Sequence, residues 1–272
     1  MKLMLAAWAT LMPVLALASE FECLIEPSQV VELRASVDGV IAAVHVQRAD
    51  ELRKGQILVE LQSEAERIAV ESARYRAQME GQIAAARTRV DYANNKLRRV
   101  IDLQKKRFVT AQALDDAEAE LHLAEDDLQA ALESRELAKI EFRQAQEQLA
   151  LRTLASPFDG VVIDRILNPG DLAESGNGRK AMLKIAQTDP LKVDVVLPAA
   201  LFGQLKVGQL AEVVSAVGAG RYQARVKLVD RVIDAASGTF VVRLELPNPE
   251  LSVPVGSRCS AEFEDISIAG KP

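Results

Sequence analysis

The side chains that most often carry out catalysis are few and scattered in this chain. The two histidines, His45 and His122, fall in unrelated segments, and neither has a cysteine or carboxylate partner at the spacing of a metal-ligand set. The glycine-rich stretch around Asn177-Gly178 lacks the following Lys-Ser/Thr of a phosphate-binding loop. We therefore expect no catalytic residue, no metal site and no enzymatic activity.

Two cysteines could form a disulfide bond. Cys23 and Cys259 lie near opposite ends of the chain, so a bond would join an early segment to a late one. In an oxidising compartment an even number of cysteines favours the bond, the alternative being two independent thiols. Closing so long a loop stabilises a fold by roughly 4 kcal/mol in the chain-entropy model. Outside the first 18 residues, Met79 and Met182 are too few for a copper-binding methionine cluster.

The N-terminus indicates which compartment that is. Lys2 supplies a positive charge, residues 3–17 are apolar, and Ala16-Leu17-Ala18 has the small-x-small pattern of a cleavage site. This predicts a signal peptide over residues 1–18. The apolar run is shorter than the roughly 20 residues of a spanning helix, although a retained N-terminal anchor is the alternative. We therefore expect a periplasmic chain, soluble after cleavage. Its formal charge of −6, or −7 without Lys2, argues against nucleic-acid binding.

A long helical block lies in the middle of the chain. Residues 64–150 contain no proline and one glycine, Gly81, and are dense in strong helix formers. In the second half of the block, small and large apolar residues from Leu114 to Leu149 alternate in steps of three and four, and only Arg135 in this stripe is polar. The first half has the same pattern except for two successive steps of four, Tyr75 to Met79 to Ile83, which form a stutter.

Charge predicts that the two halves fold back on each other as an antiparallel hairpin. The residues before the turn at 108–112 are basic and those after it are acidic, so folding back places opposite charges side by side. Thr110 is positioned to cap the second helix. The basic set is Lys96, Arg98, Arg99, Lys105, Lys106 and Arg107, and the acidic set is Asp115, Asp116, Glu118, Glu120, Glu125, Asp126 and Asp127.

The flanks of the helical block read as two copies of one β unit. Each copy has short runs of Val, Ile and Leu around an Asp-Gly pair, which predicts a tight turn, and each has a second glycine turn further on. The pairs are Asp38-Gly39 and Asp159-Gly160, and the second turns contain Gly55 and Gly170. Two such half-units normally form one flattened β-sandwich, and here the helices are inserted between them.

This arrangement resembles the membrane fusion protein, or periplasmic adaptor, family, which is HlyD-like and includes RND-type efflux adaptors. The motifs that carry the resemblance are Ser36-Val37-Asp38-Gly39-Val40-Ile41, Leu52-Arg53-Lys54-Gly55-Gln56 and Ala155-Ser156-Pro157-Phe158-Asp159-Gly160. The resemblance implies an α+β fold, an elongated adaptor with a long coiled-coil hairpin inserted in a split lipoyl-like β-sandwich, plus a small β-barrel.

The expected domains follow from this reading. A discontinuous β-barrel takes residues 19–30 and 189–266, and a split lipoyl/biotinyl-like domain takes residues 31–63 and 152–188. The hairpin takes residues 64–151. In carrier proteins of the lipoyl fold, a lysine at a hairpin tip accepts the cofactor. Here that tip opens into the helices and Lys54 lies in a different turn, so we expect no cofactor.

The hairpin tip is the expected binding site. Adaptors that dock onto TolC-like channels carry Arg, Leu and Ser here, and this chain resembles them with Arg99, Leu103 and Thr110, separated by three and six residues. Leucine would offer an apolar knob, and arginine would donate to carbonyls or carboxylates of a partner helix. Alternatively Arg99 pairs with Glu118 or Glu120 across the hairpin, Leu103 is ordinary core, and Thr110 is only a cap.

The resemblance implies a non-catalytic subunit that links an inner-membrane transporter, of RND or ABC type, to a TolC-like outer-membrane channel. Association with the inner-membrane complex and a homo-oligomer, a hexamer by family analogy, are part of that reading. About ten residues precede the first expected strand after cleavage and about seven follow the last, so we expect the membrane-proximal domain of many family members to be absent. The alternatives are a lipoyl- or biotinyl-type carrier module and a periplasmic coiled-coil scaffold without a transport role.

Overall fold

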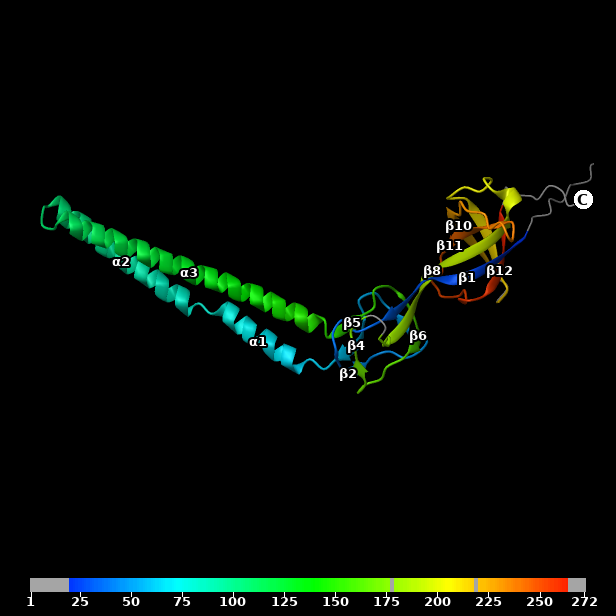
Figure 1. Ribbon diagram of the computed structural model, residues 1–272, viewed down its shortest axis with the longest axis horizontal. Coiled ribbons are helices and arrows are strands. Elements are labelled where there is room, and N and C mark those ends of the chain that lie inside the picture. The colour runs from blue at the N-terminus through cyan, green and yellow to red at the C-terminus, as the bar shows by residue number, and fades with distance from the viewer. Residues whose placement is uncertain (1–19, 177–178, 218–219, 264–272) are drawn as a thin grey trace, which may run out of the picture.

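The computed structural model describes residues 20–176, 179–217 and 220–263. The predicted signal peptide, residues 1–18, lies outside this part of the chain. The molecule is a bent rod, with a helical hairpin at one end, a β-barrel at the other and a second β unit between them (Figure 1). Within the described residues, no helix combines the length and the apolar character needed to cross a membrane.

The helices are α1 (Glu64–Gln78), α2 (Gly81–Lys105) and α3 (Ala111–Ala150), with a short 3-10 helix η1 (Ala199–Leu201). The first five strands are β1 (Phe21–Leu33), β2 (Gly39–Val44), β3 (Glu51–Leu52), β4 (Ile57–Leu61) and β5 (Thr153–Ala155). The remaining strands are β6 (Gly160–Arg165), β7 (Leu172–Ala173), β8 (Leu183–Pro198), β9 (Leu210–Ser215), β10 (Arg221–Val229), β11 (Thr239–Leu246) and β12 (Arg258–Phe263).

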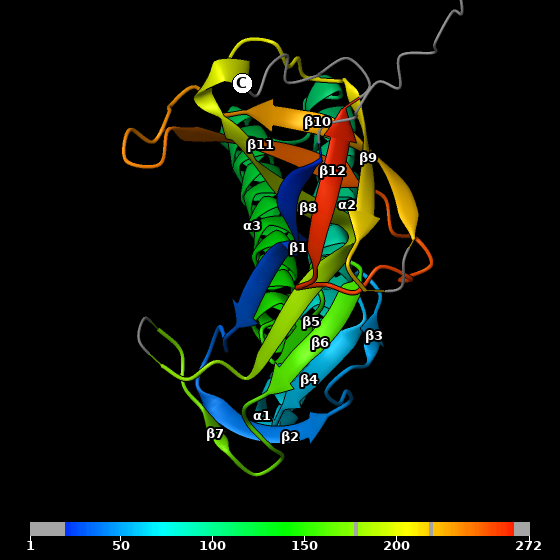
Figure 2. The same ribbon diagram turned by 90° about the vertical axis from the view of Figure 1, so that its right-hand side faces the viewer.

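Six strands close into the barrel. They run in the order β1-β12-β9-β10-β11-β8, and β8 pairs again with β1, so the sheet has no free edge there (Figure 2). Alternate residues of each strand point inward and form one apolar core that includes Ile25, Val195 and Leu244, all fully buried.

The second unit is a sandwich with its own core. Its outer sheet has the order β5-β4-β2-β7, and it packs on the first half of β8 together with β6, β3 and the end of β1. Leu58, Leu183 and Ile185 are fully buried between the two layers. β1 and β8 run through both cores, so the predicted domain boundaries at 30/31 and 188/189 lie inside continuous strands.

The two Asp-Gly pairs are not tight left-handed turns, contrary to the sequence reading. Gly39 and Gly160 each begin a strand without a positive φ. At Gly160 a side chain has no room, because a Cβ would overlap the backbone carbonyl oxygen of Ala186. At Gly39 a Cβ would lie 2.8 Å from Nη1 of Arg152, so that side chain would have to move. The second pair of turns does need glycine, since φ is +82° at Gly55 and +92° at Gly170.

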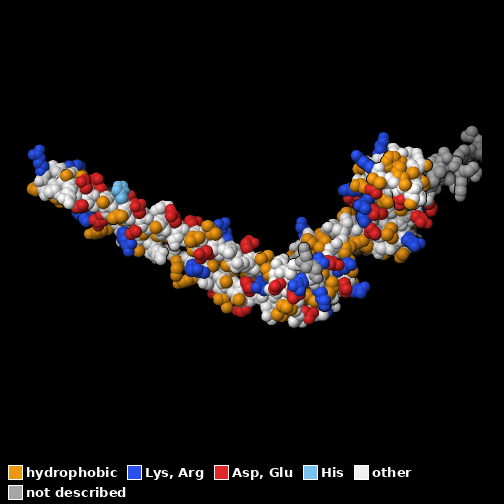
Figure 3. All heavy atoms as spheres, viewed as in Figure 1, with side chains coloured by type: hydrophobic (Ala, Val, Ile, Leu, Met, Phe, Trp, Pro, Cys, Tyr) orange, Lys and Arg blue, Asp and Glu red, His pale blue; other side chains and the backbone are white. Residues whose placement is uncertain are grey.

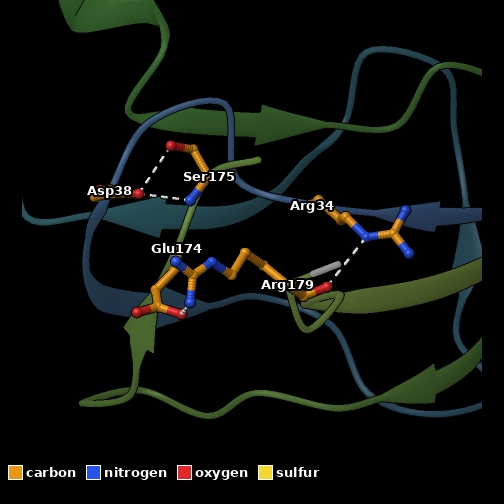
Figure 4. Close-up of polar contacts among 5 residues, drawn as sticks. All are labelled: Arg34, Asp38, Glu174, Ser175 and Arg179. Carbon is orange, nitrogen blue, oxygen red and sulfur yellow. Dashed lines mark hydrogen bonds and ion pairs between the residues drawn. The ribbon is translucent and has the colours of Figure 1, made fainter. Parts of the chain in front are cut away.

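The aspartates of these pairs bind the two copies to each other. Oδ1 of Asp38 accepts hydrogen bonds from the backbone N–H of Ser175 at 2.5 Å and from its hydroxyl at 2.8 Å (Figure 4). Oδ1 of Asp159 accepts from the backbone N–H of Lys54 at 2.8 Å. The hydrogen bonds from Ser175 lower the pKa of Asp38 below its ordinary value. Each copy of the unit therefore closes a loop of the other.

The two legs of the hairpin differ. α3 runs unbroken for 40 residues, or about 60 Å, whereas the opposite leg is divided into α1 and α2 by Met79 and Glu80. The first leg therefore consists of two helices. The break falls on the stutter in the apolar stripe, where the helix must unwind to keep its stripe on α3. Gly81, the weakest helix former of the leg, follows directly.

Candidate docking site at the hairpin tip

The end of α2 closes in a Schellman motif. The backbone N–H of Phe108 donates to the carbonyl of Leu103 at 3.0 Å, and that of Arg107 donates to the carbonyl of Gln104 at 2.8 Å. Arg107, the residue after the C-cap Lys106, has a φ of +60°, a left-handed conformation usually taken by glycine. Leu103 and Phe108 occupy the two positions of this motif whose apolar side chains commonly contact each other.

Both of these apolar side chains face solvent. Leu103 is 42% exposed and Phe108 is 75% exposed, so Leu103 is not ordinary core. Leu103 was predicted as a docking residue from the sequence, whereas Phe108 was predicted only as part of the turn. The sequence did contain a signal for Phe108. It is an aromatic residue directly after three basic residues, in a turn where no core exists to bury it. Together they form an apolar pair at the outermost point of the hairpin.

Thr110 begins the second helix. Its backbone is extended, and its Oγ1 accepts a hydrogen bond from the backbone N–H of Ala113 at 3.2 Å. This satisfies one of the unpaired amides of the first turn of α3. The residue itself is exposed, so the cap holds its hydroxyl at the rim of the tip.

Arg99 is exposed and makes no ion pair or hydrogen bond within the part of the chain that the structure describes. Glu120, one of its two candidate partners, instead pairs with Lys96. The hydrogen bond and the charge of Glu120 raise the pKa of Lys96. Pairing across the hairpin thus occurs about one turn below Arg99, whose guanidinium keeps its donors for another group.

The tip is basic around its apolar pair. Space-filling Figure 3 shows Lys and Arg side chains at the outer end of the hairpin and acidic ones further along it. The basic residues nearest the turn are Arg98, Arg99, Lys105, Lys106 and Arg107. An exposed apolar pair with several cations near it is a surface suited to bind a partner with an apolar groove and acceptor groups at its edge.

The predicted disulfide partners are joined at the other end of the molecule. Sγ of Cys23 is bonded to Sγ of Cys259, and the two residues face each other directly across β1 and β12 with a Cα–Cα distance of 4.8 Å. Both are buried in the barrel core. The bond is remote from the tip and belongs to the scaffold.

The histidines lie far apart, as their separate segments implied. His45 on the sandwich contacts Glu60 through Nε2 at 3.0 Å, and His122 on α3 lies 3.6 Å from Glu125. The described residues contain no group of three or more His, Cys, Asp or Glu that could hold a metal ion.

The family described as CzcB-like, barrel-sandwich hybrid domain, matches residues 29–178, more than half of the chain. The chain belongs to this family. The matched region is the inserted hairpin together with the β-sandwich up to the residues before β8, so the CzcB-like signature covers most of the two parts that position the tip. The resemblance to membrane fusion proteins that the sequence indicated is confirmed, and so is the predicted fold class.

Curated relatives of this CzcB-like chain carry a consistent name. The multidrug resistance protein MdtA of Cronobacter turicensis is 26% identical over 233 residues, which cover 83% of this chain and 53% of the relative. MdtA of Escherichia coli is 27% identical over the same shares. The chain therefore spans about half the length of the curated relatives it matches.

Solved structures share the fold. MacA from Actinobacillus actinomycetemcomitans has a TM-score of 0.74 at 21% identity, covering 92% of this chain and 79% of that one. The membrane fusion protein Spr0693 from Streptococcus pneumoniae R6 has a TM-score of 0.60 at 19% identity, covering 92% and 100%. At these identities the likeness concerns the arrangement of hairpin, sandwich and barrel.

Proposed function

We propose that this chain is a periplasmic adaptor of a tripartite efflux or secretion system. In this proposal the hairpin tip docks onto a TolC-like outer-membrane channel, and the barrel end associates with an inner-membrane transporter of RND or ABC type. The adaptor contributes no catalysis of its own, and its copies assemble as a homo-oligomer, a hexamer by family analogy. The observation that carries the proposal is the exposed apolar pair, Leu103 and Phe108, held at the end of a long hairpin beside Arg99, which has no ion-pair partner among the described residues.

Each tip residue has a distinct part in docking. Leu103 and Phe108 would enter an apolar groove between helices of the channel, and their burial is the main source of binding free energy. Arg99 would donate its planar fork to carbonyls or carboxylates at the groove edge, which fixes orientation. Thr110 holds the start of α3 and offers its hydroxyl at the rim. The names of the curated relatives support efflux of drugs as the process served.

Export to the periplasm is also part of the proposal. It is supported by the leader pattern in residues 1–18 and by the Cys23–Cys259 bond, which persists in an oxidising compartment.

The test is a charge reversal at the tip with a matched control. Arg99→Asp should weaken association with the channel by at least about tenfold in Kd, because an acid replaces the donor at the interface. Arg87→Asp is the control, since Arg87 is an exposed arginine on the same helix but lies well below the tip. Association is measured by cross-linking in cells and by titration of the purified proteins.

Two outcomes would contradict docking through the tip. One is that the Arg99→Asp variant cross-links to the channel as well as the native chain does, while its melting temperature is lower. The other is equal weakening by Arg87→Asp, which would indicate a general charge effect. Efflux of a dye panel from a deletion strain distinguishes the adaptor from a scaffold without a transport role. An intact mass with a covalent addition would favour the carrier module.

A further inference from the structure

The hairpin has a weak point near the middle of one leg. At Met79 the backbone is extended, with ψ +123°, and its N–H donates to the carbonyl of Arg76 rather than continuing the helix. α2 then begins at Gly81, while α3 passes the interruption without a break. Figure 1 shows the connection between α1 and α2 as a short non-helical segment alongside the continuous α3. We call Met79 and Glu80 the break.

The packing opposite the break is poor. Arg135 is the one polar residue in the apolar stripe of α3, and its Nε is buried without a hydrogen-bond partner. Its Nη2 reaches across to Oε1 of Glu80 at 3.0 Å, but the side chain of Glu80 is 71% exposed. A groove of about 240 Å³ lies here, and Met79 and Leu137 in its lining are both more than half exposed. Ile83, also in the lining, is buried, so the weakly packed part of this layer is the contact between Arg135 and the break itself.

The base of the hairpin is held much more firmly. Nη2 of Arg152 bonds Oε1 of Glu66 on α1 at 2.5 Å, and Nη1 donates to the carbonyl of Asp38 in the sandwich at 2.9 Å. The side chains of Arg152 and Glu66 are only 22% and 20% exposed. The carbonyl of Arg152 also accepts from the N–H of Leu61, the last residue of β4. One residue thus connects α1, the end of α3 and two segments of the sandwich.

We propose that the hairpin bends at the break, while its base moves as one body with the sandwich. A helix bends most readily where its hydrogen-bond ladder is interrupted, and motion is easiest where few apolar contacts must be lost. The break meets both conditions. Because α3 is continuous past the break, it curves there while α2 and the tip move relative to α1. The inference concerns this chain alone and does not depend on which partner binds the tip.

Distances between spin labels on the intact chain test the proposal. One pair of cysteines replaces Glu71 on α1 and Asn95 on α2, and spans the break; a second replaces Arg48 in the sandwich and Glu71, and spans the base. All three residues are exposed. We expect a broad distance distribution across the break and a narrow one across the base.

Substitutions at Arg135 and Arg152 then test the break and the base of the hairpin separately. Arg135→Leu completes the apolar stripe, so the broad component across the break should be lost, while Arg143→Leu, at an exposed arginine on the same helix, should leave it unchanged. Arg152→Ala should broaden the distribution across the base only. A narrow distribution across the break in the native chain would overturn the proposal. So would a base distribution as broad as that across the break, or an equal effect of Arg143→Leu. Circular dichroism checks that each variant is folded.

Discussion

Asp194 lies in the middle of a row of charges on the outside of the barrel. Its two carboxylate oxygens accept hydrogen bonds from Nε and Nη2 of Arg243 on β11 at 2.8 and 3.2 Å. Lys192 lies 3.5 Å from Asp194 and 2.6 Å from Glu26, so the row crosses β1, β8 and β11. Partial burial would raise the pKa of Asp194, but the hydrogen bonds and charges of Arg243 and Lys192 outweigh it and the pKa is lowered.

This pKa shift predicts an acid-dependent loss of stability. A carboxyl whose folded pKa is depressed stabilises the fold fully above its unfolded pKa, and the contribution is lost as pH falls through the folded value. We therefore expect Asp194→Asn to lower the urea midpoint at pH 6, and the difference from the native chain to disappear at pH values well below 3.8, the ordinary pKa of this group.

Asp164→Asn is the control, because Asp164 is exposed and has no ion pair in the described residues. A difference for Asp194→Asn that persists at low pH would mean that Asp194 acts through packing rather than charge.

Single residues also show where sequence reasoning reached its limit. The Asp-Gly pairs correctly marked the two copies of the β unit, but a turn assigned from the dipeptide alone was wrong. At Gly160 the requirement comes from the backbone of Ala186, on a strand distant in sequence. Close approach between distant segments leaves no local pattern, so only the three-dimensional structure shows why this glycine cannot be replaced.

At the scale of elements, the helices were the most predictable part. Composition marked the helical block as residues 64–150, and the structure begins α1 at Glu64 and ends α3 at Ala150. The stutter was visible in the sequence, but a stutter can be absorbed by gentle unwinding or by a break. Which of the two occurs depends on the residue of α3 that faces the stutter, and here that residue is Arg135. The pattern of the first leg alone therefore could not predict the break.

The end of α2 gives a prediction of its own. Arg107 has φ +60°, a conformation that costs a residue with a Cβ roughly 1 kcal/mol and costs glycine almost nothing. We expect Arg107→Gly to stabilise the tip by up to about 1 kcal/mol. Slower amide hydrogen exchange at residues 103–110 would show this.

Lys106→Gly is the matched control, since φ is −86° at Lys106 and the same substitution there should speed exchange. Faster exchange in Arg107→Gly would indicate that the side chain of Arg107 holds the turn through contacts.

The whole molecule is built from two cores that share two strands. The order β, long α, β in the sequence predicted an insertion, and the split sandwich and closed barrel fit that order. The continuity of β1 and β8 was not predictable, because Pro27 and Asp189-Pro190 look like strand breaks. In the structure they fall where the two cores meet, and β1 shifts register against β8 between Pro27 and Gln29.

The disulfide should stabilise one core more than the other. Cys23 and Cys259 are both in the barrel core and are separated by 236 positions in the chain. We expect the double variant Cys23→Ser, Cys259→Ser to lose about 2–5 kcal/mol of barrel stability. Hydrogen exchange should accelerate at barrel residues such as Val195 and remain unchanged at sandwich residues such as Leu58. Equal acceleration in both cores would mean that they unfold as a single cooperative unit.

The shared strands also decide how force passes through the molecule. Within the described residues, the chain crosses from barrel to sandwich on β1 and returns on β8, which lie side by side as an antiparallel ribbon. A tension applied along the rod is carried by covalent backbone in both strands, so the joint hardly stretches. A two-stranded ribbon bends easily perpendicular to its face and resists bending within the plane of the two strands. We therefore expect the barrel to tilt relative to the sandwich in one direction and to keep its alignment in the perpendicular direction.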